Sequence, residues 1–544
     1  MHRSYNKVKE FKEHMNEQDK WYKLRWISLI FVALSLLVIS LDNTVLNLAL
    51  PSIARDLKAS ASQLQWIVDS YTLVFAGTLL SMGTIGDRFG RKRVLQAGLV
   101  VFGCFSLWAA FSASTGTLVV MRAIMGLGGA AIMPSTLSIL TSTFRDNKER
   151  AQAIAIWAAV FALGTGIGPL VGGYLLEHYN WSSVFFINIP IIIIALIGGA
   201  FAIQDSKGAN PHKVDFFGFV LSIAGLFALV YAIIQAGVNG WTSANVLWAF
   251  AAAAVLLALF IIGELRSKSP ILPLQFFRNP SFSGANLALT LVAFGLFGSF
   301  FFLGQYLQSV KGYTPLESGV RLLPMAMIIF VAALVSARVA RALGTKITVG
   351  VGIMLASIGF FYFARTMTLD ASYLTIVIGM CIVALGIGMT MSPATNSVMG
   401  SIPHGKAGVG SAMNDTTRQI GGALGVAVLG TVLNSGYIKQ INLVQWPLNL
   451  PAQGLAAIHS SIQAALVTAE KLQIQSPELA QFIIINSKQA FITGAQRAST
   501  IAAIVLMAAS IVTFIILPKR VITPEEVKGE VTPDMLVEED IVKQ

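Results

Sequence analysis

Long apolar stretches alternate with short polar segments along most of the chain. Each apolar stretch holds about 20 residues, the length that an α-helix needs to cross the hydrocarbon core of a bilayer. The pattern predicts fourteen membrane-spanning helices, near residues 26–50, 63–83, 94–113, 117–141, 151–176, 183–203, 216–236, 244–264, 282–307, 318–340, 346–365, 372–396, 407–434 and 494–517. The predicted fold class is therefore an all-α polytopic membrane protein.

Composition supports this prediction. Of 544 residues, 55% are hydrophobic and 12% are charged, whereas a soluble domain carries about 25% charged residues. The net charge of +12 does not gather into a patch for nucleic acid, because the cations lie in loops. Cys104 and Cys381, the two cysteines, both lie in apolar segments and support neither a disulfide framework nor a metal site.

Lysine and arginine follow an alternating pattern in the first half of the chain. The segment before the first span has seven of them, and the loops after the second and fourth spans have four and three. The loops after the third, fifth and seventh spans have none. Because cytoplasmic loops are enriched in these residues, we expect both termini in the cytoplasm. The first apolar stretch lacks a small-residue cleavage site, so we expect a retained helix and not a signal peptide.

The spans suggest two six-helix bundles, separated by two inserted helices. A weak repeat supports the division, since the loop after the tenth span, Arg341–Lys346, resembles the loop Gly83–Leu95 after the second. Transporters are often built from such repeats, with the substrate site between them. The predicted parts are a cytoplasmic basic tail, 1–25, an N-terminal bundle, 26–203, linker helices, 216–264, a C-terminal bundle, 282–517, with an extracellular helical hairpin or helix pair within 435–493, and a cytoplasmic tail, 518–544.

Glycine is concentrated in the fifth span. The stretch Gly164-Thr-Gly-Ile-Gly-Pro-Leu-Val-Gly-Gly173 contains five glycines and Pro169. Such a helix survives in a bilayer only when it packs against neighbours, and small residues let helices approach closely. The stretch predicts a tightly packed helix with a candidate bend at Pro169; ordinary close packing is the alternative.

The predicted spans contain several charged residues, and the candidates for a function among them are Asp42, Asp69, Arg122 and Asp415. Charges in a membrane are costly and usually mark function. A buried acid can bind either a proton or a cation, so the two ligands can compete for one carboxylate. The alternatives are structural: Asp42 as a helix cap near a kink, Arg122 as a partner that holds helices together, Asp415 neutralised by Arg418, and Asp69 as a carboxylate in water near a helix end.

The loop after the second span reads Gly83-Thr-Ile-Gly-Asp-Arg-Phe-Gly-Arg-Lys, with Asp87 at a helix end. An acid there can pair with an arginine or a helix end in one state and release it in another. A solvated basic loop that only fixes topology is the alternative. No phosphate-binding loop occurs, because the segment His404-Gly-Lys-Ala lacks the upstream glycine and the following Ser or Thr.

These motifs together resemble the fourteen-helix drug/proton antiporters of the major facilitator superfamily. The loop resembles the superfamily's gating motif, with Gly83, Asp87, Arg88, Gly90 and Arg91 at the matching positions. The fifth span resembles the antiporter motif through Gly164, Gly168, Pro169, Gly172 and Gly173. Asp42 and Arg122 match motifs of the first and fourth spans, and Asp69 is similar to an acid of quaternary-ammonium and multidrug efflux pumps.

The resemblance implies a proton-coupled antiporter that exports lipophilic, cationic drugs or biocides by alternating access and confers drug resistance. The resemblance also implies a protein that is not an enzyme and needs no cofactor, because the proton gradient would drive transport. Expected partners are small-molecule substrates, protons and lipid, with no nucleic acid, in a monomer in the cell membrane (inner or plasma membrane). The expected substrate-binding residues are Asp42, Asp69, Trp66, Tyr71 and Gln305, and the expected proton-coupling residues are Asp42, Arg122 and Asp415.

Two other functions stay open. The first is a dedicated exporter of one metabolite, such as an amino acid, a peptide or a siderophore. The second is a non-transporting membrane receptor or scaffold, for which the extracellular segment is the best support.

Overall fold

The computed structural model describes residues 22–144, 146–207, 215–267, 274–402, 407–447, 450 and 452–522. Helices form the molecule throughout this part of the chain, and no strand occurs in it. Most of the two predicted tails, residues 1–21 and 523–544, lies outside the described residues.

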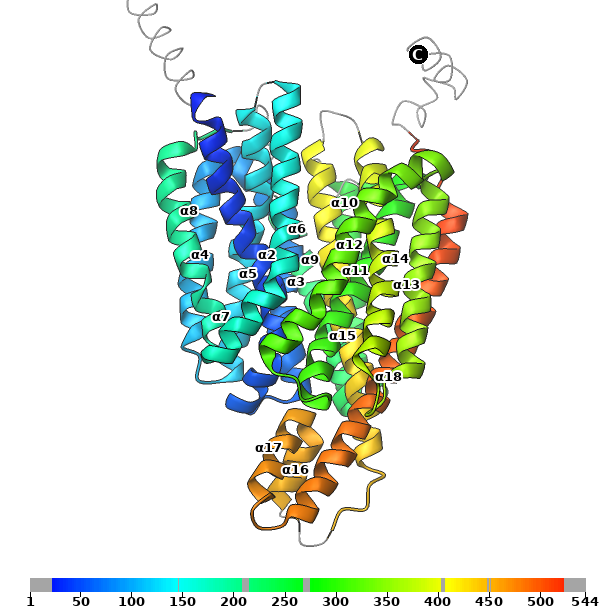
Figure 1. Ribbon diagram of the computed structural model, residues 1–544. Helices are drawn as coiled ribbons and strands as arrows, with labels where there is room; N and C mark the ends of the chain where they lie inside the picture. The colour runs from blue at the N-terminus through cyan, green and yellow to red at the C-terminus, as the bar shows by residue number, and fades with distance from the viewer. Residues whose placement is uncertain are drawn as a thin grey trace, which may run out of the picture.

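Two bundles stand side by side in Figure 1. The first consists of α2 (Arg25–Asp56), α3 (Ala61–Phe89), α4 (Arg91–Ala110), α5 (Thr115–Thr143), α6 (Asn147–His178), α7 (Ser183–Phe186) and α8 (Asn188–Ala202). The second consists of α11 (Pro280–Gln305), η2 (Tyr306–Val310), α12 (Pro315–Leu343), α13 (Thr345–Thr366), α14 (Tyr373–Gly400), α15 (Ala407–Ile441) and α18 (Pro477–Ile516). Between them in the chain come α9 (Phe216–Asn239), α10 (Ala244–Arg266) and the short η1 (Leu274–Arg278).

Thirteen of the described helical segments are long and apolar enough to cross a bilayer. They correspond to thirteen of the fourteen predicted spans. The fourteenth is α3, which has 29 residues, as many as α5, and packs along it. We therefore assign α3 to the fourteenth span on its length and its place in the bundle.

Each bundle has its own apolar core. One buried cluster is formed almost entirely by α2 to α8, and another by α11 to α18. Inserted helix α9 packs against α3 and α15 and therefore touches both bundles, and α10 packs on α9. A third, smaller cluster includes Leu73 of α3, Val230 of α9 and Ala427 of α15.

The predicted repeat has a structural counterpart. Helices α3 and α12 both begin with a capping box and both end at a glycine with positive φ, Gly90 (115°) and Gly344 (88°). The residue after each glycine donates its backbone N–H to a carbonyl that follows the last helix of its own bundle: Arg91 to Ser206 and Thr345 to Lys519. Residues with side chains rarely adopt this backbone conformation, which explains glycine at both positions.

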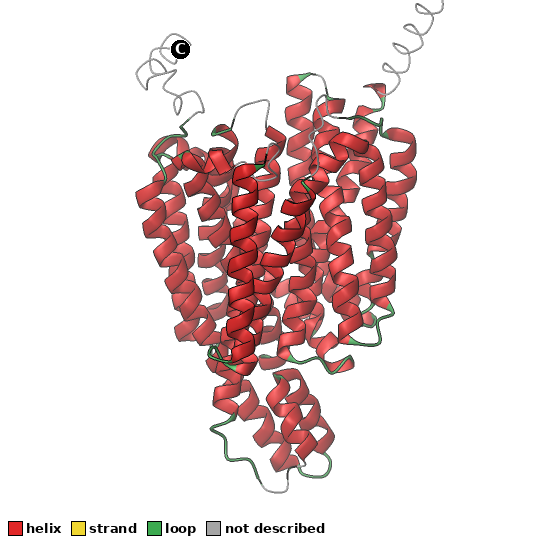
Figure 2. Ribbon diagram, turned by 180° about the vertical axis from the view of Figure 1, so that it is seen from behind, coloured by secondary structure: helices red, strands yellow, loops and turns green. Residues whose placement is uncertain are grey.

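We name the two ends of the bundle by what they carry. The termini end contains the start of α2 at Arg25 and the end of α18 at Ile516, at the top of Figure 1. The hairpin end carries α16 (Ala452–Ser460) and α17 (Ile462–Leu472), which project from the bundle with the first part of α18. Figure 2 shows the same projection from behind. The segment 435–493 thus contains a pair of helices, although α15 runs further, to Ile441, and α18 begins earlier, at Pro477, than predicted.

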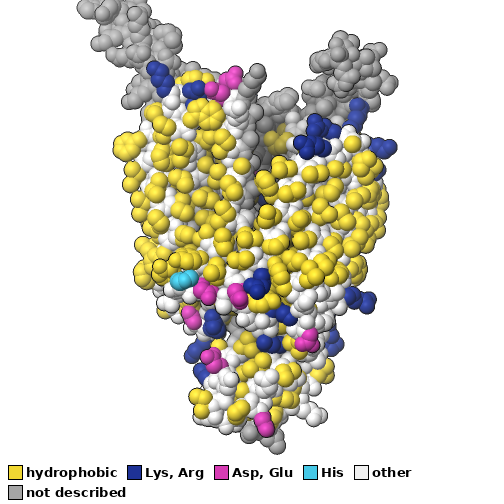
Figure 3. Space-filling model, viewed as in Figure 1, with side chains coloured by type: hydrophobic (Ala, Val, Ile, Leu, Met, Phe, Trp, Pro, Cys, Tyr) yellow, Lys and Arg dark blue, Asp and Glu magenta, His cyan; other side chains and the backbone are white. Residues whose placement is uncertain are grey.

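Apolar side chains cover the middle of the molecule on the face in Figure 3, and charged side chains gather toward its two ends. Large apolar residues are well exposed on the surface of the molecule, among them Phe201, Phe217 and Trp248, which are 76%, 80% and 75% exposed. Such a surface suits lipid and not water. The molecule is a multi-pass membrane protein.

Candidate functional site

A buried ion pair joins two of the predicted intramembrane charges. Nη1 of Arg122, on α5, lies 2.5 Å from Oδ2 of Asp42, on α2, and both side chains are 2% exposed. The residues are 80 positions apart in the chain. Coulomb attraction is strong at such a site, but the two ions lose their hydration, so a buried pair is retained only with good geometry and additional hydrogen bonds.

Helix α3 supplies the additional contacts. Arg122 Nε donates to the carbonyl of Ile67 at 3.2 Å, and the guanidinium carbon lies 4.3 Å from the centre of the Tyr71 ring. This cation–π contact stabilises the guanidinium where water is excluded. Gly129 on α5 permits it, because a Cβ there would lie 2.9 Å from the Tyr71 hydroxyl oxygen. Asp42 and Tyr71, two predicted substrate residues, are thus occupied by Arg122 in this state.

Asp69 lies on α3 near the hairpin end and is fully buried, with no exposed surface. Neither carboxylate oxygen has a hydrogen-bond partner among the described residues. Gln65, one turn earlier on α3, faces α15, and Leu73, one turn later, packs with α9 and α15. The alternative of a carboxylate in water is therefore wrong, because α3 is covered there by neighbouring helices.

Two further predicted substrate residues make protein contacts. Trp66 lies 4.9 Å from Phe227 and 6.2 Å from Tyr231, ring centre to ring centre, and both rings belong to α9. Gln305, at the end of α11, is buried; its Nε2 donates to the carbonyl of Phe301, and its Oε1 accepts from Gln463 on α17 at 3.0 Å. The structure therefore does not bring the five predicted substrate residues into one open pocket.

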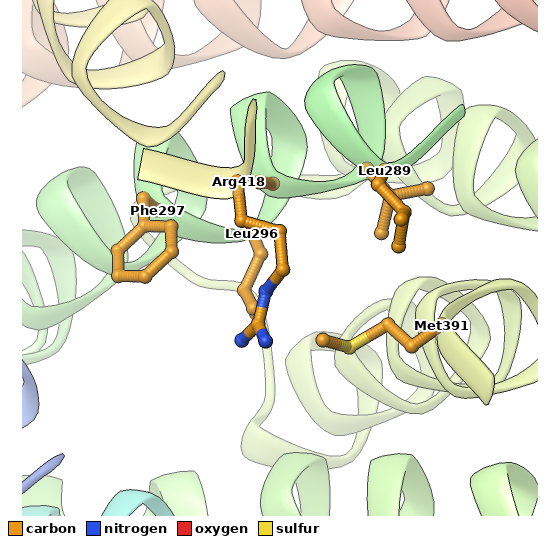
Figure 4. A pocket seen from close by; sticks show the side chains of 7 residues that line it. Leu289, Leu296, Phe297, Met391 and Arg418 are labelled. Carbon is orange, nitrogen blue, oxygen red and sulfur yellow. The ribbon is translucent and has the colours of Figure 1, made fainter. Parts of the chain in front are cut away.

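Asp415 lies in the first third of α15, one turn before Arg418. The closest ion-pair distance, Arg418 Nη1 to Asp415 Oδ1, is 3.8 Å, and the side chains are 22% and 12% exposed. Arg418 extends toward the first bundle, since its guanidinium carbon lies 5.8 Å from the Phe161 ring centre on α6. Figure 4 shows it in a shallow recess, between Phe297 and Met391.

Arg418 is a residue of this site for which the sequence predicted only a role as the neutralising partner of Asp415. The signal for a larger role was its place in the thirteenth predicted span, one turn from an acid. Because Arg418 extends toward the first bundle and both side chains are partly exposed, this pair is more open to a bound molecule than Asp42 and Arg122 or the buried Asp69.

The predicted gating motif lies at the termini end. Asp87 Oδ1 accepts from Arg91 Nε at 2.8 Å, and Arg91 Nη1 donates to the carbonyl of Ser138 on α5 at 3.1 Å. Gly90 lies against Asp205, where a Cβ would be 2.6 Å from a carboxylate oxygen. The acid near the end of α3 is thus bound in this state to the arginine that begins α4.

An ion pair ties α2 to α6 at the same end. Arg25 Nε donates to Glu149 Oε2 at 2.8 Å, and Arg25 Nη2 donates to Glu149 Oε1 at 2.8 Å. This bidentate hydrogen bond from Arg25 holds the pKa of Glu149 below its usual range. The carboxylate therefore stays ionised, and the pair stays formed, until the pH falls through that lowered pKa.

The glycine-rich stretch of α6 packs on two helices at once. A Cβ at Gly164 would lie 2.7 Å from Ser40 Oγ, and one at Gly172 would lie 2.8 Å from Val45, both on α2. Gly168 faces Thr44 in the same row. On another side, a Cβ at Gly173 would lie 2.7 Å from the carbonyl oxygen of Pro315 on α12, in the second bundle.

Pro169 lies within α6 and completes this contact between the bundles. Its carbonyl oxygen faces Gly319 of α12, where a Cβ would collide with it. The motif thus forms the contact of α6 with α2 and part of the interface between the two bundles. Small residues allow the backbones to approach this closely.

Hydrogen bonds hold the bundles together toward the hairpin end. Gln65 Nε2 on α3 donates to the carbonyls of Ala427 (3.0 Å) and Val426 (3.3 Å) on α15. Gln308 Nε2 donates to the carbonyl of Leu48 on α2 at 2.9 Å, and the backbone N–H of Leu316 lies 3.3 Å from Glu177 of α6. The bundles are therefore closed against each other at this end.

Replacing Gln65 with Leu is expected to weaken this closure, because it removes the hydrogen bonds from α3 to α15, each of which contributes about 0.5–1.5 kcal/mol. In protein without its native cysteines, spin labels at Ser62 and Leu443 report the separation of the bundles. The variant should raise several-fold the fraction of molecules in which the two labels are far apart. An unchanged distance distribution would show that Gln65 does not hold the two bundles together.

Comparison with known proteins agrees with this architecture. The family model described as Major Facilitator Superfamily matches residues 32–426. The solved inward-facing, unoccupied structure of a bacterial homolog of the human lysosomal transporter Spinster has a TM-score of 0.60 at 18% identity, over 90% of this chain and 98% of that one. A D-xylose-proton symporter has a TM-score of 0.56 at 11% identity, over 91% and 98% of the two chains.

Curated relatives match most of the chain. It is 35% identical to the multidrug efflux pump LfrA of Mycolicibacterium smegmatis, over 90% of this chain and 95% of the relative. It is 34% identical to the tetracenomycin C resistance and export protein of Streptomyces glaucescens, over 90% and 91%. It is 32% identical to the methyl viologen resistance protein SmvA of Salmonella typhimurium, over 86% and 93%. With its helical bundles, its motifs and these matches, the chain belongs to the Major Facilitator Superfamily.

Proposed function

We propose that this protein is a proton-coupled exporter of lipophilic small molecules, cations among them, that works by alternating access in a cell membrane. The observation that carries the proposal is the buried pair of Asp42 and Arg122, supported by similarity to proteins named for multidrug efflux and for methyl viologen resistance. The proton gradient supplies the energy, without a bound cofactor.

The pair would couple proton binding to movement. A proton that reaches Asp42 removes the negative charge, so that Arg122 loses its ionic partner while Tyr71 and Ile67 still hold it. Breaking one side of a buried pair is costly, and rearrangement of α2 against α5 relieves that cost. Proton binding in this way favours one of two arrangements of the helices.

The interface between the bundles would allow the movement. Because Gly173 and Gly319 present almost no side chain, α6 and α12 can separate and return without interlocked side chains. The state described here is closed at the hairpin end. With the termini end in the cytoplasm, as the loop cations indicate, closure at the hairpin end is what an exporter needs before it takes up cargo from the cytoplasm.

The space beside Arg418 is the proposed cargo contact. Phe161, Phe297 and Met391 offer aromatic and thioether surface there, and Asp415 offers a carboxylate. A cationic cargo would displace Arg418 from Asp415, which is feasible because the two groups are 3.8 Å apart and partly exposed. A neutral cargo would bind without that exchange.

A second candidate is export of one compound and not of many. Two relatives are named for single antibiotics: the tetracenomycin C resistance and export protein, and the puromycin resistance protein of Streptomyces alboniger, 34% identical over 75% of this chain. Asp415 is the one intramembrane acid that we place at the cargo contact. A single carboxylate for cationic cargo also favours a narrow range of exported cations.

The experiment that tests the proposal is ethidium uptake into inside-out vesicles under an imposed pH gradient. We expect uptake that a protonophore abolishes, and about tenfold less ethidium uptake for Asp415→Asn, because a cation loses a charge-assisted contact worth about 1.5–3 kcal/mol. The matched control is Asp370→Asn, which changes an exposed acid outside the helices.

Uptake that persists in the presence of the protonophore would refute proton coupling. Absence of gradient-driven uptake, in vesicles shown to contain folded protein, would refute ethidium export and direct the search to a single dedicated compound.

A further inference from the structure

A cavity of about 420 Å³ lies at the hairpin end, where both bundles meet α17. Its walls come from the ends of α2 and α6, from η2 and the start of α12, and from α17. Small-molecule sites commonly have volumes of about 300–1,000 Å³. This cavity shares no lining residue with the recess beside Arg418, so it is a separate place on the molecule.

One buried side chain in its wall has an unused acceptor. Gln463 of α17 is 3% exposed, and its Nε2 donates to Gln305 Oε1 at 3.0 Å and to Ser309 Oγ at 3.4 Å. These bonds fix the direction of the amide. Its Oε1 has no hydrogen-bond partner among the described residues. Leaving a buried acceptor unpaired is costly, and a ligand with an N–H group would supply the missing donor.

The charged groups of the wall favour a cation. Glu177 and Glu470 face the cavity together with one guanidinium, that of Arg55. Arg55 donates to Ser52 at 3.3 Å on its own helix. Two carboxylates against one guanidinium leave the cavity with an excess of negative charge. Charge-assisted hydrogen bonds to carboxylates are about twice as strong as neutral ones, so an ammonium group is the donor that this wall suits best.

The rest of the wall is suited to an apolar group. Leu176, Leu466 and Val467 line the cavity beside the ring of Tyr313. One face of that ring is already covered by Arg321, whose guanidinium carbon lies 3.9 Å from the ring centre. Aliphatic side chains from α6 and α17 thus offer surface for the hydrophobic part of an amphiphile.

We propose that this cavity binds an amphiphilic ammonium ion with free N–H groups, from the hairpin side of the membrane. The ammonium group donates to Gln463 Oε1 and Glu470, and the apolar part packs against Leu176 and Leu466. Because the walls belong to both bundles and to α17, an occupied cavity holds the three together. The bound amine therefore opposes opening at the hairpin end; its effect on export rests on the function proposed above.

The test compares two ligands of equal charge on purified protein in nanodiscs. The probes are 4-phenylbutylamine, which has N–H donors, and its trimethylammonium analogue, which has none. Calorimetry should show several-fold tighter binding of the primary amine. Glu470→Gln should weaken binding of the amine by about tenfold, whereas Glu478→Gln, in the first turn of α18 and outside the cavity wall, should leave it unchanged.

Three results would overturn the proposal: equal affinity for the two probes, equal affinity of the Glu470 and Glu478 variants, or binding that falls in Asp415→Asn but not in Glu470→Gln. The last would place the amine at the cargo contact. Spin labels at Ser62 and Leu443 give a second readout, because bound amine should raise the fraction of molecules in which the two labels are close together. Neither measurement requires transport, so a failure of the export proposal leaves this test intact.

Discussion

Asp42→Asn is expected to abolish proton-driven transport and to destabilise the protein by about 3–5 kcal/mol. The substitution removes the carboxylate but leaves Arg122 buried, with its cation–π contact to Tyr71 and its bond to the Ile67 carbonyl. The Tyr71 ring and the Ile67 carbonyl do not replace the hydration that the Arg122 guanidinium loses on burial unless the Asp42 carboxylate is also present. Thermal unfolding in detergent and gradient-driven ethidium uptake measure the two effects separately.

A double variant separates coupling from structural support. In Asp42→Asn with Arg122→Gln the buried site is neutral, so the double variant avoids the uncompensated buried charge that makes removal of one partner costly. We expect a midpoint of unfolding close to that of the wild type, with transport still lost. If a stable double variant transports as fast as the wild type, the pair serves only to hold α2 and α5 together.

Gly173→Ala is expected to reduce transport by about tenfold by destabilising the state that is closed at the hairpin end. The added Cβ would lie 2.7 Å from the Pro315 carbonyl oxygen and 2.8 Å from the Leu316 Cα. Backbone atoms cannot move aside cheaply, and overpacking of this kind costs about 1–3 kcal/mol. The cost falls on the closed state, because opening separates α6 from α12, and a difference of 1.4 kcal/mol changes a population ratio tenfold.

The matched control lies on the same helix. A Cβ at Gly166 would meet Ala326 Cβ at 3.7 Å, an ordinary van der Waals distance. Gly166→Ala should therefore transport like the wild type and should not move the Ser62–Leu443 distance, whereas Gly173→Ala should lengthen it. An equal loss of transport in both variants would indicate that α6 requires glycine in general, and not that Gly173 is needed for a contact between the bundles.

The elements of the fold were predictable because a bilayer imposes one rule on every spanning segment. Each backbone polar group must be satisfied within a helix, so apolar stretches such as Pro280–Val310 and Tyr373–Gly400 reveal helices directly. The boundaries beyond the bilayer were less predictable. There α18 starts at Pro477 with polar residues that hydropathy does not associate with a span.

The buried charges were each predictable, but their partners were not. Asp42 and Arg122 are evident as charges in apolar segments, yet they are 80 residues apart and their contact depends on how α2 packs on α5. Asp69 shows the same limit. Its position near a helix end left an exposed carboxylate open as the alternative to a buried one, and only the packing of α3 against α9 and α15 decides for burial.

The hairpin end carries the least sequence signal. Gln463 lies in a helix whose polar and apolar residues alternate as in any surface helix, and nothing in the local sequence indicates that its amide reaches Gln305 and Ser309, more than 150 positions earlier. Only the position of α17 over the closed bundles reveals that contact.

Proton counterflow tests the central claim most directly. Wild-type protein is reconstituted into proteoliposomes with a pH-sensitive dye inside, and an ethidium gradient is imposed without any initial pH difference. The account predicts that ethidium movement drives protons in the opposite direction in the wild type, and that the double variant Asp42→Asn with Arg122→Gln moves none. Ethidium that crosses through the wild-type protein while the internal pH stays constant would contradict it.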